Sequence, residues 1–254
     1  MVSALAVDDV AVDRGFSHPR AQVGAHLFVG RQAIHDRCGG VHGYEFLYRA
    51  GREHALRVDL WPAPAQDRAT LRVLQATFGP AGVRSVAASA RVFVNVTRAF
   101  LVGELPVPEE PDRLVLEVVE SVRTDAAVLD GVVRLRRRGF SIAIDDFVGL
   151  TSQVALLPYA DYVKVDYRDL AARGPALLDL AAGHGATLVA ERIETPEQLA
   201  HCRELGFDLF QGFHLDVTHV LNRTPVPSVH SGRPVLRALD GARPRTPVRE
   251  AASA

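Results

Sequence analysis

The sequence is poor in cysteine and has no long hydrophobic run. Its two cysteines, Cys38 and Cys202, lie far apart, so they show no metal-binding spacing and make a poor disulfide framework. No apolar stretch approaches the roughly 18 residues that a membrane-spanning helix needs. The first residues carry Asp8, Asp9 and Asp13 and lack the basic and then apolar regions of a signal peptide. These absences favour a reducing, cytoplasmic setting.

An excess of charge of one sign is also missing. The formal net charge is -1 and the pI is about 6.8, which predicts no general attraction to a nucleic acid polymer or to an anionic membrane. Hydrophobic residues are abundant instead, at 48% of the 254 residues. The chain can therefore bury a sizeable core, in one large barrel or in two small domains.

Strand and helix patterns alternate along most of the chain. Apolar runs rich in β-branched residues predict eight strands, at residues 25–32, 42–49, 92–96, 114–120, 141–147, 162–166, 187–193 and 209–214. Helical spacing is found near residues 64–78, 124–138, 167–183 and 195–205, with Thr124 as a candidate N-cap. We expect a loose leader at 1–24, a barrel domain at 25–220 and a disordered tail, rich in proline and arginine, at 221–254.

This alternation predicts an α/β fold with mainly parallel strands. The short turn at Cys38, Gly39 and Gly40 predicts that the first two strands form an antiparallel hairpin. Eight strands suit a closed (β/α)8 barrel of the TIM type with its first strand antiparallel. An open doubly wound sheet is the alternative, but it normally carries a Gly-rich phosphate loop after its first strand, and none is present.

A polar residue stands within or at the end of seven successive strands. In chain order they are Glu45, Asn95, Glu117, Asp145 with Asp146, Lys164, Glu191 with Glu194, and Gln211. In a barrel such strand ends converge on one mouth. Six carboxylates and one ammonium would leave excess negative charge, which oxygen-binding divalent cations such as Mg²⁺, Mn²⁺ or Ca²⁺ can offset. A two-metal site of this kind suits phosphodiester hydrolysis, whereas polar strand ends paired with helix caps and loops are the alternative.

The motifs resemble, in order, those of the EAL domain, a bacterial phosphodiesterase domain that acts on cyclic di-GMP. The resemblance runs from about Phe28 to His214 and includes Glu45-Phe46-Leu47-Tyr48-Arg49, Phe93-Val94-Asn95, Leu116-Glu117-Val118-Val119-Glu120-Ser121, Asp145-Asp146-Phe147, Lys164-Val165-Asp166, Ala190-Glu191-Arg192-Ile193-Glu194-Thr195 and Gln211-Gly212-Phe213. Gly30-Arg31-Gln32 and Tyr44-Glu45-Phe46-Leu47-Tyr48-Arg49 look closest to the branch in which EAL is fused to an HDOD domain. No HDOD domain is expected here, because only about 40 residues follow Gln211.

The resemblance implies roles for these residues. Glu45, Asn95, Glu117 and Asp145 would bind the first of two Mg²⁺ or Mn²⁺ ions. Asp146 would serve the second ion, and Glu191 would be a further metal ligand. Lys164, Glu191 and Glu45 would be catalytic, with Lys164 helping to hold the attacking water. Arg49, Gln32 and Gln211 would contact substrate, and Glu194 would support the site. The expected activity is metal-dependent hydrolysis of cyclic di-GMP to linear pGpG in second-messenger signalling, with a second copy or another signalling protein as partner.

Three departures from the family pattern bear on turnover. Phe46 replaces the signature alanine, and Asp216-Val217-Thr218 replaces Ser-Lys-Pro. After Asp-Asp-Phe the family has Gly-Thr-Gly-Tyr-Ser-Ser, where this chain has residues 148–153. Because Val148 disfavours a positive φ, we expect any such turn to move to Gly149 and hydrolysis to slow more than binding. The alternative is a weak or inactive module that binds cyclic di-GMP or a protein, and an unrelated barrel hydrolase would require the motif order to be a coincidence.

Overall fold

The computed structural model describes residues 27–51, 58–80 and 82–223. Within them nine strands form one sheet: β1 (Phe28–Asp36), β2 (Val41–Arg49), β3 (Arg91–Val96), β4 (Leu114–Val118), β5 (Ser141–Ile144), β6 (Tyr162–Asp166), β7 (Thr187–Glu191), β8 (Leu209–Phe210) and β9 (His219–Asn222). β1 pairs with both β2 and β8, so the first eight strands close into a barrel. The predicted leader, and the predicted tail from residue 224 onward, lie outside the described residues.

The barrel is mixed, as the sequence predicts. β1 runs antiparallel to β2, and the turn between them places Gly39 at φ +83°, a conformation that glycine adopts without strain. From β2 to β8 each strand is parallel to the next. The carboxyl ends of these seven strands therefore share one mouth.

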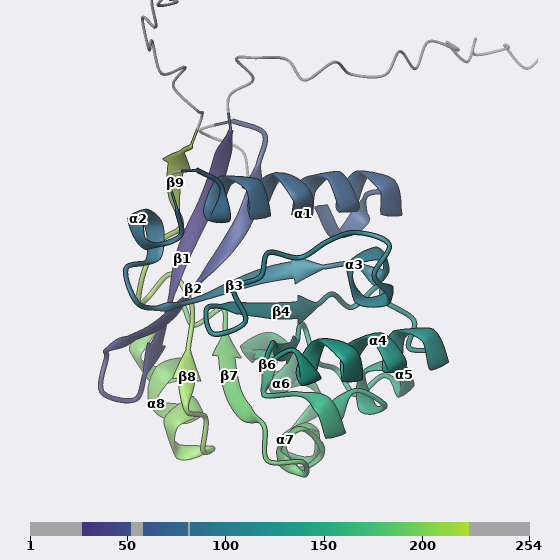
Figure 1. The fold of residues 1–254 in the computed structure, drawn as a ribbon. Helices are drawn as coiled ribbons and strands as arrows, with labels where there is room; N and C mark the ends of the chain where they lie inside the picture. The colour runs from purple at the N-terminus through teal and green to yellow at the C-terminus, as the bar shows by residue number, and fades with distance from the viewer. Residues whose placement is uncertain (1–26, 52–57, 81, 224–254) are drawn as a thin grey trace, which may run out of the picture.

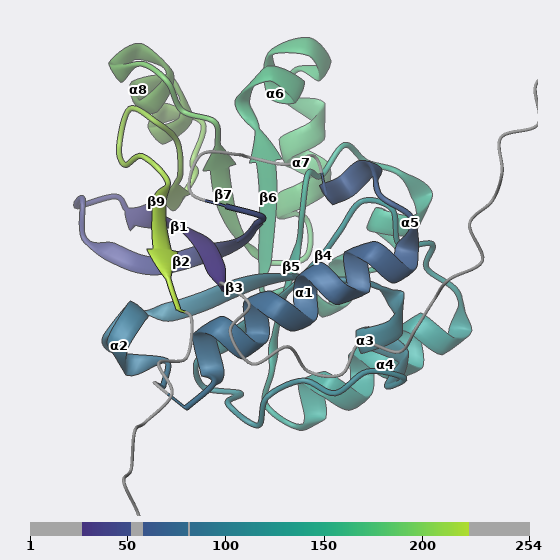
Figure 2. The same ribbon diagram turned by 90° about the horizontal axis from the view of Figure 1, so that it is seen from above.

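Helices surround the barrel: α1 (Ala63–Phe78), α2 (Arg84–Ala87), α3 (Arg98–Val102), α4 (Ala126–Arg137), α5 (Thr151–Val154), α6 (Tyr167–Arg173), α7 (Ala176–Ala182) and α8 (Pro196–Glu204). Two short 3-10 turns are also present: η1 (Val58–Leu60) precedes α1, and η2 (Leu157–Tyr159) lies between α5 and β6. α1 lies on one side of the barrel, while α6 and α8 lie on the opposite side (Figure 1, Figure 2). None of the helices in the described part combines the length and apolar character needed to cross a bilayer.

Three local features differ from the sequence prediction. The helix predicted at 167–183 is divided into α6 and α7, because Gly174 takes a φ of +77° and Pro175 lacks an amide donor. α4 is capped by Asp125, whose carboxylate accepts from the Val128 amide, while Thr124 bonds elsewhere. β9 was not predicted; it pairs antiparallel with the first half of β1, beside the short β1–β8 contact.

The barrel interior is filled by a layer of apolar side chains. Seven strands each contribute one, namely Ile34, Phe93, Val115, Ala143, Tyr162, Val189 and Leu209. On β2 the corresponding position is Gly43, and a Cβ there would lie 2.7 Å from the Phe93 ring. Gly43 therefore leaves room for that ring. The residues that alternate with this layer face outward and pack against the helices in a second, larger core.

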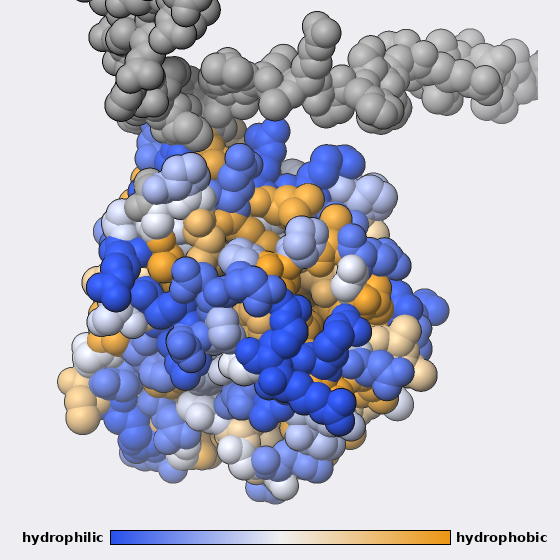
Figure 3. Space-filling view, in the orientation of Figure 1, coloured by the Kyte–Doolittle hydropathy of each residue, from blue (hydrophilic) through white to orange (hydrophobic). Residues whose placement is uncertain are grey.

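The basic end of α4 has ion-pair partners. Arg136 contacts Asp161 at 2.5 Å and Arg138 pairs with Glu109. Hydrophilic residues gather over α4 on the face seen in Figure 3, with a band of hydrophobic residues above them. Because these arginines are matched by acids and lie at the negative pole of a helix, they need no polyanionic partner to account for them.

Candidate active site at the barrel mouth

A ring of eight polar residues lies one pleat above the apolar layer. Each of the eight barrel strands supplies one member at or just beyond its length: Gln32, Glu45, Asn95, Glu117, Asp145, Lys164, Glu191 and Gln211. Each member stands two residues from the layer residue of its own strand, so both face the interior. The sequence therefore builds the ring by placing one polar residue on each inward-facing row.

Lys164 is the centre of this ring and the only lysine of the chain. Its side chain is 1% exposed, and its ammonium lies 2.8 Å from oxygens of both Glu117 and Glu191. Asp145 is 3.0 Å away and Glu45 is 3.6 Å away. A buried ammonium is stable only with such partners, and a compact ammonium can serve several at once.

Carboxamides hold Glu45 on its other sides. Gln211 donates to Glu45 Oε2 at 2.6 Å and, more weakly, to Gln32 Oε1 at 3.3 Å. Asn95 donates a long 3.5 Å bond to Glu45 Oε1. Gln32 in turn donates to the Asp216 carbonyl, which connects the ring to the segment before β9. Gln211 thus contacts a ring carboxylate directly, and Gln32 reaches it only through Gln211.

Asp146 lies beside the ring rather than in it. Oxygens of Asp145, Asp146 and Glu191 lie within 4.8 Å of one another, which is close enough to share a cation. Asp146 has a φ of +43°, a left-handed conformation that is uncommon for a residue with a side chain. Arg192, directly after Glu191, also has a positive φ, at +54°. Such outliers cluster at functional sites because the surroundings must enforce them.

The carboxylates exceed the positive charge available to them. Burial raises the pKa of Glu117 and Glu191 well above their usual range, although Lys164 opposes this. Burial and then repulsion from Asp145 raise the pKa of Asp146 to about 7. Burial alone would lower the pKa of Lys164, but its four acidic neighbours raise it well above the usual range. A bound divalent cation would oppose these upward shifts, because it favours the ionised carboxylates and competes with protons for them.

The remaining predicted site residues lie at the rim. Arg49 is half-buried, donates to the Tyr48 carbonyl and lies against Gly30 of β1. A Cβ at position 30 would be 3.0 Å from the Arg49 guanidinium carbon and 2.9 Å from Thr218, so Gly30 makes space for this side chain. Glu194 is exposed and is not brought into the ring by any described contact of its carboxylate. Its supporting role stays a prediction.

Two groups at the mouth were not identified from the sequence. Asp166, at the end of β6, is 3% exposed and pairs with Arg168 at 2.6 Å and Arg192 at 2.8 Å. Gln153, in α5, is 4% exposed and bonds the backbone that follows the ring residue Asp145. Gln153 gives no sequence signal, because a glutamine between serine and valine in a short helix looks like part of a solvated face.

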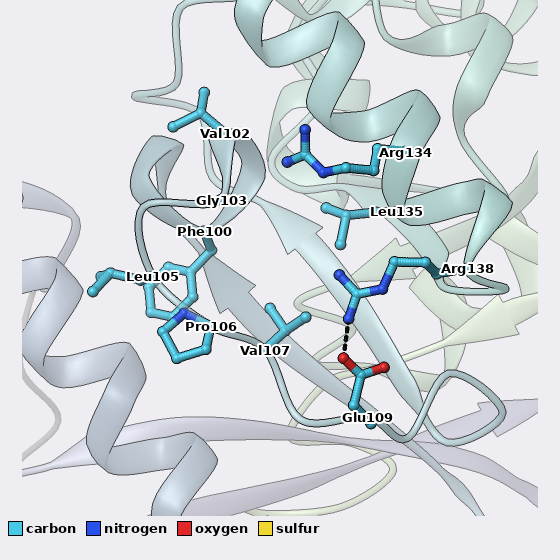
Figure 4. Close-up of a pocket in the computed structure, with 10 residues that line it drawn as sticks. All are labelled: Phe100, Val102, Gly103, Leu105, Pro106, Val107, Glu109, Arg134, Leu135 and Arg138. Atoms are coloured by element: carbon cyan, nitrogen blue, oxygen red, sulfur yellow. Dashed lines mark hydrogen bonds and ion pairs between the residues drawn. The ribbon is translucent and has the colours of Figure 1, made fainter.

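A surface hollow lies outside the barrel, between α3, the segment after it and the last turns of α4 (Figure 4). Its wall is mixed, with Phe100 and Val107 beside the charged side chains of Arg134 and Arg138. Its one acid, Glu109, is paired with Arg138, and Arg134 donates to the Leu101 carbonyl. No ring residue lines this hollow, so it is separate from the barrel mouth.

Comparisons with known proteins match the part of the chain that carries most of the ring. A family model described as "EAL domain" matches residues 104–216, which include the ring residues from β4 to β8. The chain is 29% identical over 210 residues to the cyclic di-GMP phosphodiesterase CdgJ of Vibrio cholerae, covering 80% of this chain and 47% of CdgJ. The chain spans about half the length of the curated relatives that it matches.

Solved structures share the fold. PaMucR phosphodiesterase, in a complex with c-di-GMP, aligns with a TM-score of 0.61 and 23% identity over 76% of this chain and 92% of that one. Klebsiella pneumoniae BlrP1, with manganese and cyclic di-GMP, aligns with a TM-score of 0.57 and 24% identity over 82% of this chain and 61% of that one. The closer resemblance to the branch with an HDOD domain stays a prediction.

Proposed function

This chain belongs to the EAL domain family, and we propose that it hydrolyses cyclic di-GMP to linear pGpG with the help of Mg²⁺ or Mn²⁺. One observation carries the proposal: four ring carboxylates surround a single buried ammonium, with a fifth, that of Asp146, beside them. CdgJ is named as a phosphodiesterase for this nucleotide, and the BlrP1 structure contains manganese, which supports both the substrate and the type of ion.

The donor set fits divalent cations. Among the described residues, Asn95 Oδ1, Glu117 Oε2 and Glu191 Oε2 are buried oxygens without a hydrogen-bond partner. Such atoms are costly unless they bind something, and carboxylate and carboxamide oxygens suit Mg²⁺ and Mn²⁺. Glu45, Asn95, Glu117 and Asp145 would hold one ion, and Asp145, Asp146 and Glu191 a second. Ions there supply positive charge that offsets the phosphodiester and lower the pKa of a water molecule.

The side chains around the ions orient the reactants. Lys164, which shares its ammonium among carboxylates on β2, β4, β5 and β7, would hold a water molecule as well as the ligands. Glu191, whose Oε2 has no partner among the described residues, would act in catalysis as a ligand that holds the second ion beside that water. The forked donors of Arg49 suit a substrate phosphate. Gln211 and Gln32 contact Glu45 or one another, which favours a role in fixing this ligand over recognition of the nucleotide.

A binding module without efficient turnover is the second candidate, because residues 148–153 depart from the family pattern. As predicted, Gly149 has the positive φ, at +78°. The loop is also well bonded, since the Gln153 side chain accepts from the Val148 and Leu150 amides. Slower hydrolysis than in members with the usual loop stays a prediction. So do a cytoplasmic setting and a protein partner, the former supported by the free thiols of Cys38 and Cys202.

The decisive experiment is incubation with cyclic di-GMP and Mg²⁺ or Mn²⁺, followed by chromatography of the products. Glu45→Ala and Asp145→Asn should abolish formation of pGpG, and Glu204→Ala, on the exposed face of α8, is the control. Removing one acid from a site with excess negative charge should leave the fold intact, which thermal unfolding checks. Wild-type turnover in either ligand variant would contradict the site assignment. Tight cyclic di-GMP binding without product would favour the binding module.

A further inference from the structure

The chain directly after the ring residue of β5 makes an abrupt turn. The Asp145 amide donates to the backbone carbonyl of Val118 in β4 at 3.1 Å. The Phe147 amide donates to the backbone carbonyl of Lys164 in β6 at 2.9 Å. Asp146 lies between these two anchored residues in its left-handed conformation. Because this backbone angle is unfavourable for an aspartate, neighbouring groups must hold it.

Gln153 is the side chain that does so. Its amide nitrogen donates to the Asp146 carbonyl at 2.9 Å and approaches the Asp145 carbonyl at 3.4 Å. Its oxygen accepts from the amides of Val148 at 2.9 Å and Leu150 at 3.2 Å. One buried carboxamide therefore bonds four backbone groups around the turn. The orientation of the peptide after Asp146, and with it the direction of the Asp146 side chain, depends on these bonds.

We propose that Gln153 is a positioning residue that sets the Asp146 carboxylate to bind a divalent cation together with Asp145 and Glu191. This inference rests on the proposed function. It is selective for one of the two ions, since Glu45 is held by Gln211 and Asp145 is also held by Lys164. Losing Gln153 should lower the affinity for the ion that Asp146 binds. It should leave unchanged the affinity for the ion that Glu45, Asn95 and Glu117 bind.

The test is a titration of the whole chain with Mn²⁺, in which free Mn²⁺ is measured by electron paramagnetic resonance. Gln153→Met keeps most of the side-chain volume and removes all four bonds, and Gln153→Glu keeps the two acceptor contacts and removes both donor contacts. Thr151→Ala, an exposed change in the same short helix, is the matched control. We expect two ions in the wild type and the control. In both Gln153 variants one ion should bind about 10- to 100-fold more weakly, the usual effect of losing a group that orients a ligand.

A second readout locates the ion that remains. Because Lys164 is the only lysine, protein grown with lysine labelled at the ε-carbon gives one side-chain signal, at the centre of the ring. This signal should still be broadened by the tighter Mn²⁺ ion, which is paramagnetic, in both Gln153 variants. Two ions with wild-type affinity in Gln153→Met, or in Gln153→Glu if the first variant does not fold, would overturn the role of Gln153. An equal loss of affinity for both ions would also overturn it, because the substitution would then disturb the whole site and not only the position of Asp146. A wild type that binds no Mn²⁺ would overturn the proposed function as well.

Discussion

Replacing Lys164 with methionine should destabilise the metal-free protein. Methionine keeps the unbranched stem and removes the charge that four carboxylates share at 2.8 to 3.6 Å. Removing one partner of a buried ion pair costs about 3 to 5 kcal/mol, because the other partner is left without compensation. For a domain of this size each kcal/mol lowers the melting temperature by about 2 to 4 °C. The expected decrease is therefore about 6 to 20 °C.

The decrease should be larger at high pH. A carboxyl whose pKa is higher in the folded than in the unfolded chain takes up a proton on folding, so rising pH disfavours the folded state. This already holds for Asp146, Glu117 and Glu191 in the wild type. Without the Lys164 ammonium their pKa values rise further, so the variant should lose more stability at about pH 8 than at about pH 5.

Thermal unfolding followed by circular dichroism, with a chelator present, measures both effects. Lys164→Arg is the comparison, because it keeps the positive charge but replaces the compact ammonium with a planar guanidinium. Its melting temperature should lie between those of the wild type and Lys164→Met. Adding Mn²⁺ should raise the melting temperature of the wild type, since the ion binds the folded state. A methionine variant that melts within about 2 °C of the wild type at high pH, or that loses more stability at low pH, would refute the assigned charge balance.

Three further predictions follow from contacts at the mouth. Gly30→Ala should displace the Arg49 guanidinium, so the affinity for cyclic di-GMP should fall about tenfold with little change in melting temperature. Gly51→Ala, at a glycine with no close neighbours, is the control and should change neither quantity. Equal affinities of the Gly30→Ala variant and the wild type in isothermal titration calorimetry would contradict this prediction. Mn²⁺ binding should release protons near neutral pH, because the pKa of Asp146 is about 7. The binding enthalpy measured by calorimetry should therefore depend on the ionisation enthalpy of the buffer, and an enthalpy that is the same in all buffers would contradict the prediction. Asp166→Asn should weaken the ion pairs with Arg168 and Arg192, so proteases should cleave the chain faster near α6. An unchanged cleavage rate would contradict this prediction.

Most of the ring could be predicted because its pattern is local. An inward-facing residue recurs every second position along a strand, so a polar residue two places beyond a layer residue must face the same interior. Phe93 and Asn95 show this on β3, and Tyr162 and Lys164 show it on β6. The short turn at Gly39 likewise predicted the antiparallel first pair. Helix ends were less certain, because Thr124 and Asp125 are both good caps and only packing selects between them.

The sequence by itself determined which residue types enter the barrel mouth and from which strands, since both depend on alternation within single strands. Only the tertiary structure decided how they share charge. Four carboxylates from separate strands meet one ammonium because β1 closes the barrel between β2 and β8, a contact between distant segments. The left-handed Asp146 and the bonds of Gln153 to its carbonyl were decided in the same way. A carboxamide bond to the backbone depends on where two segments lie in space, and residue spacing along the chain does not encode that position.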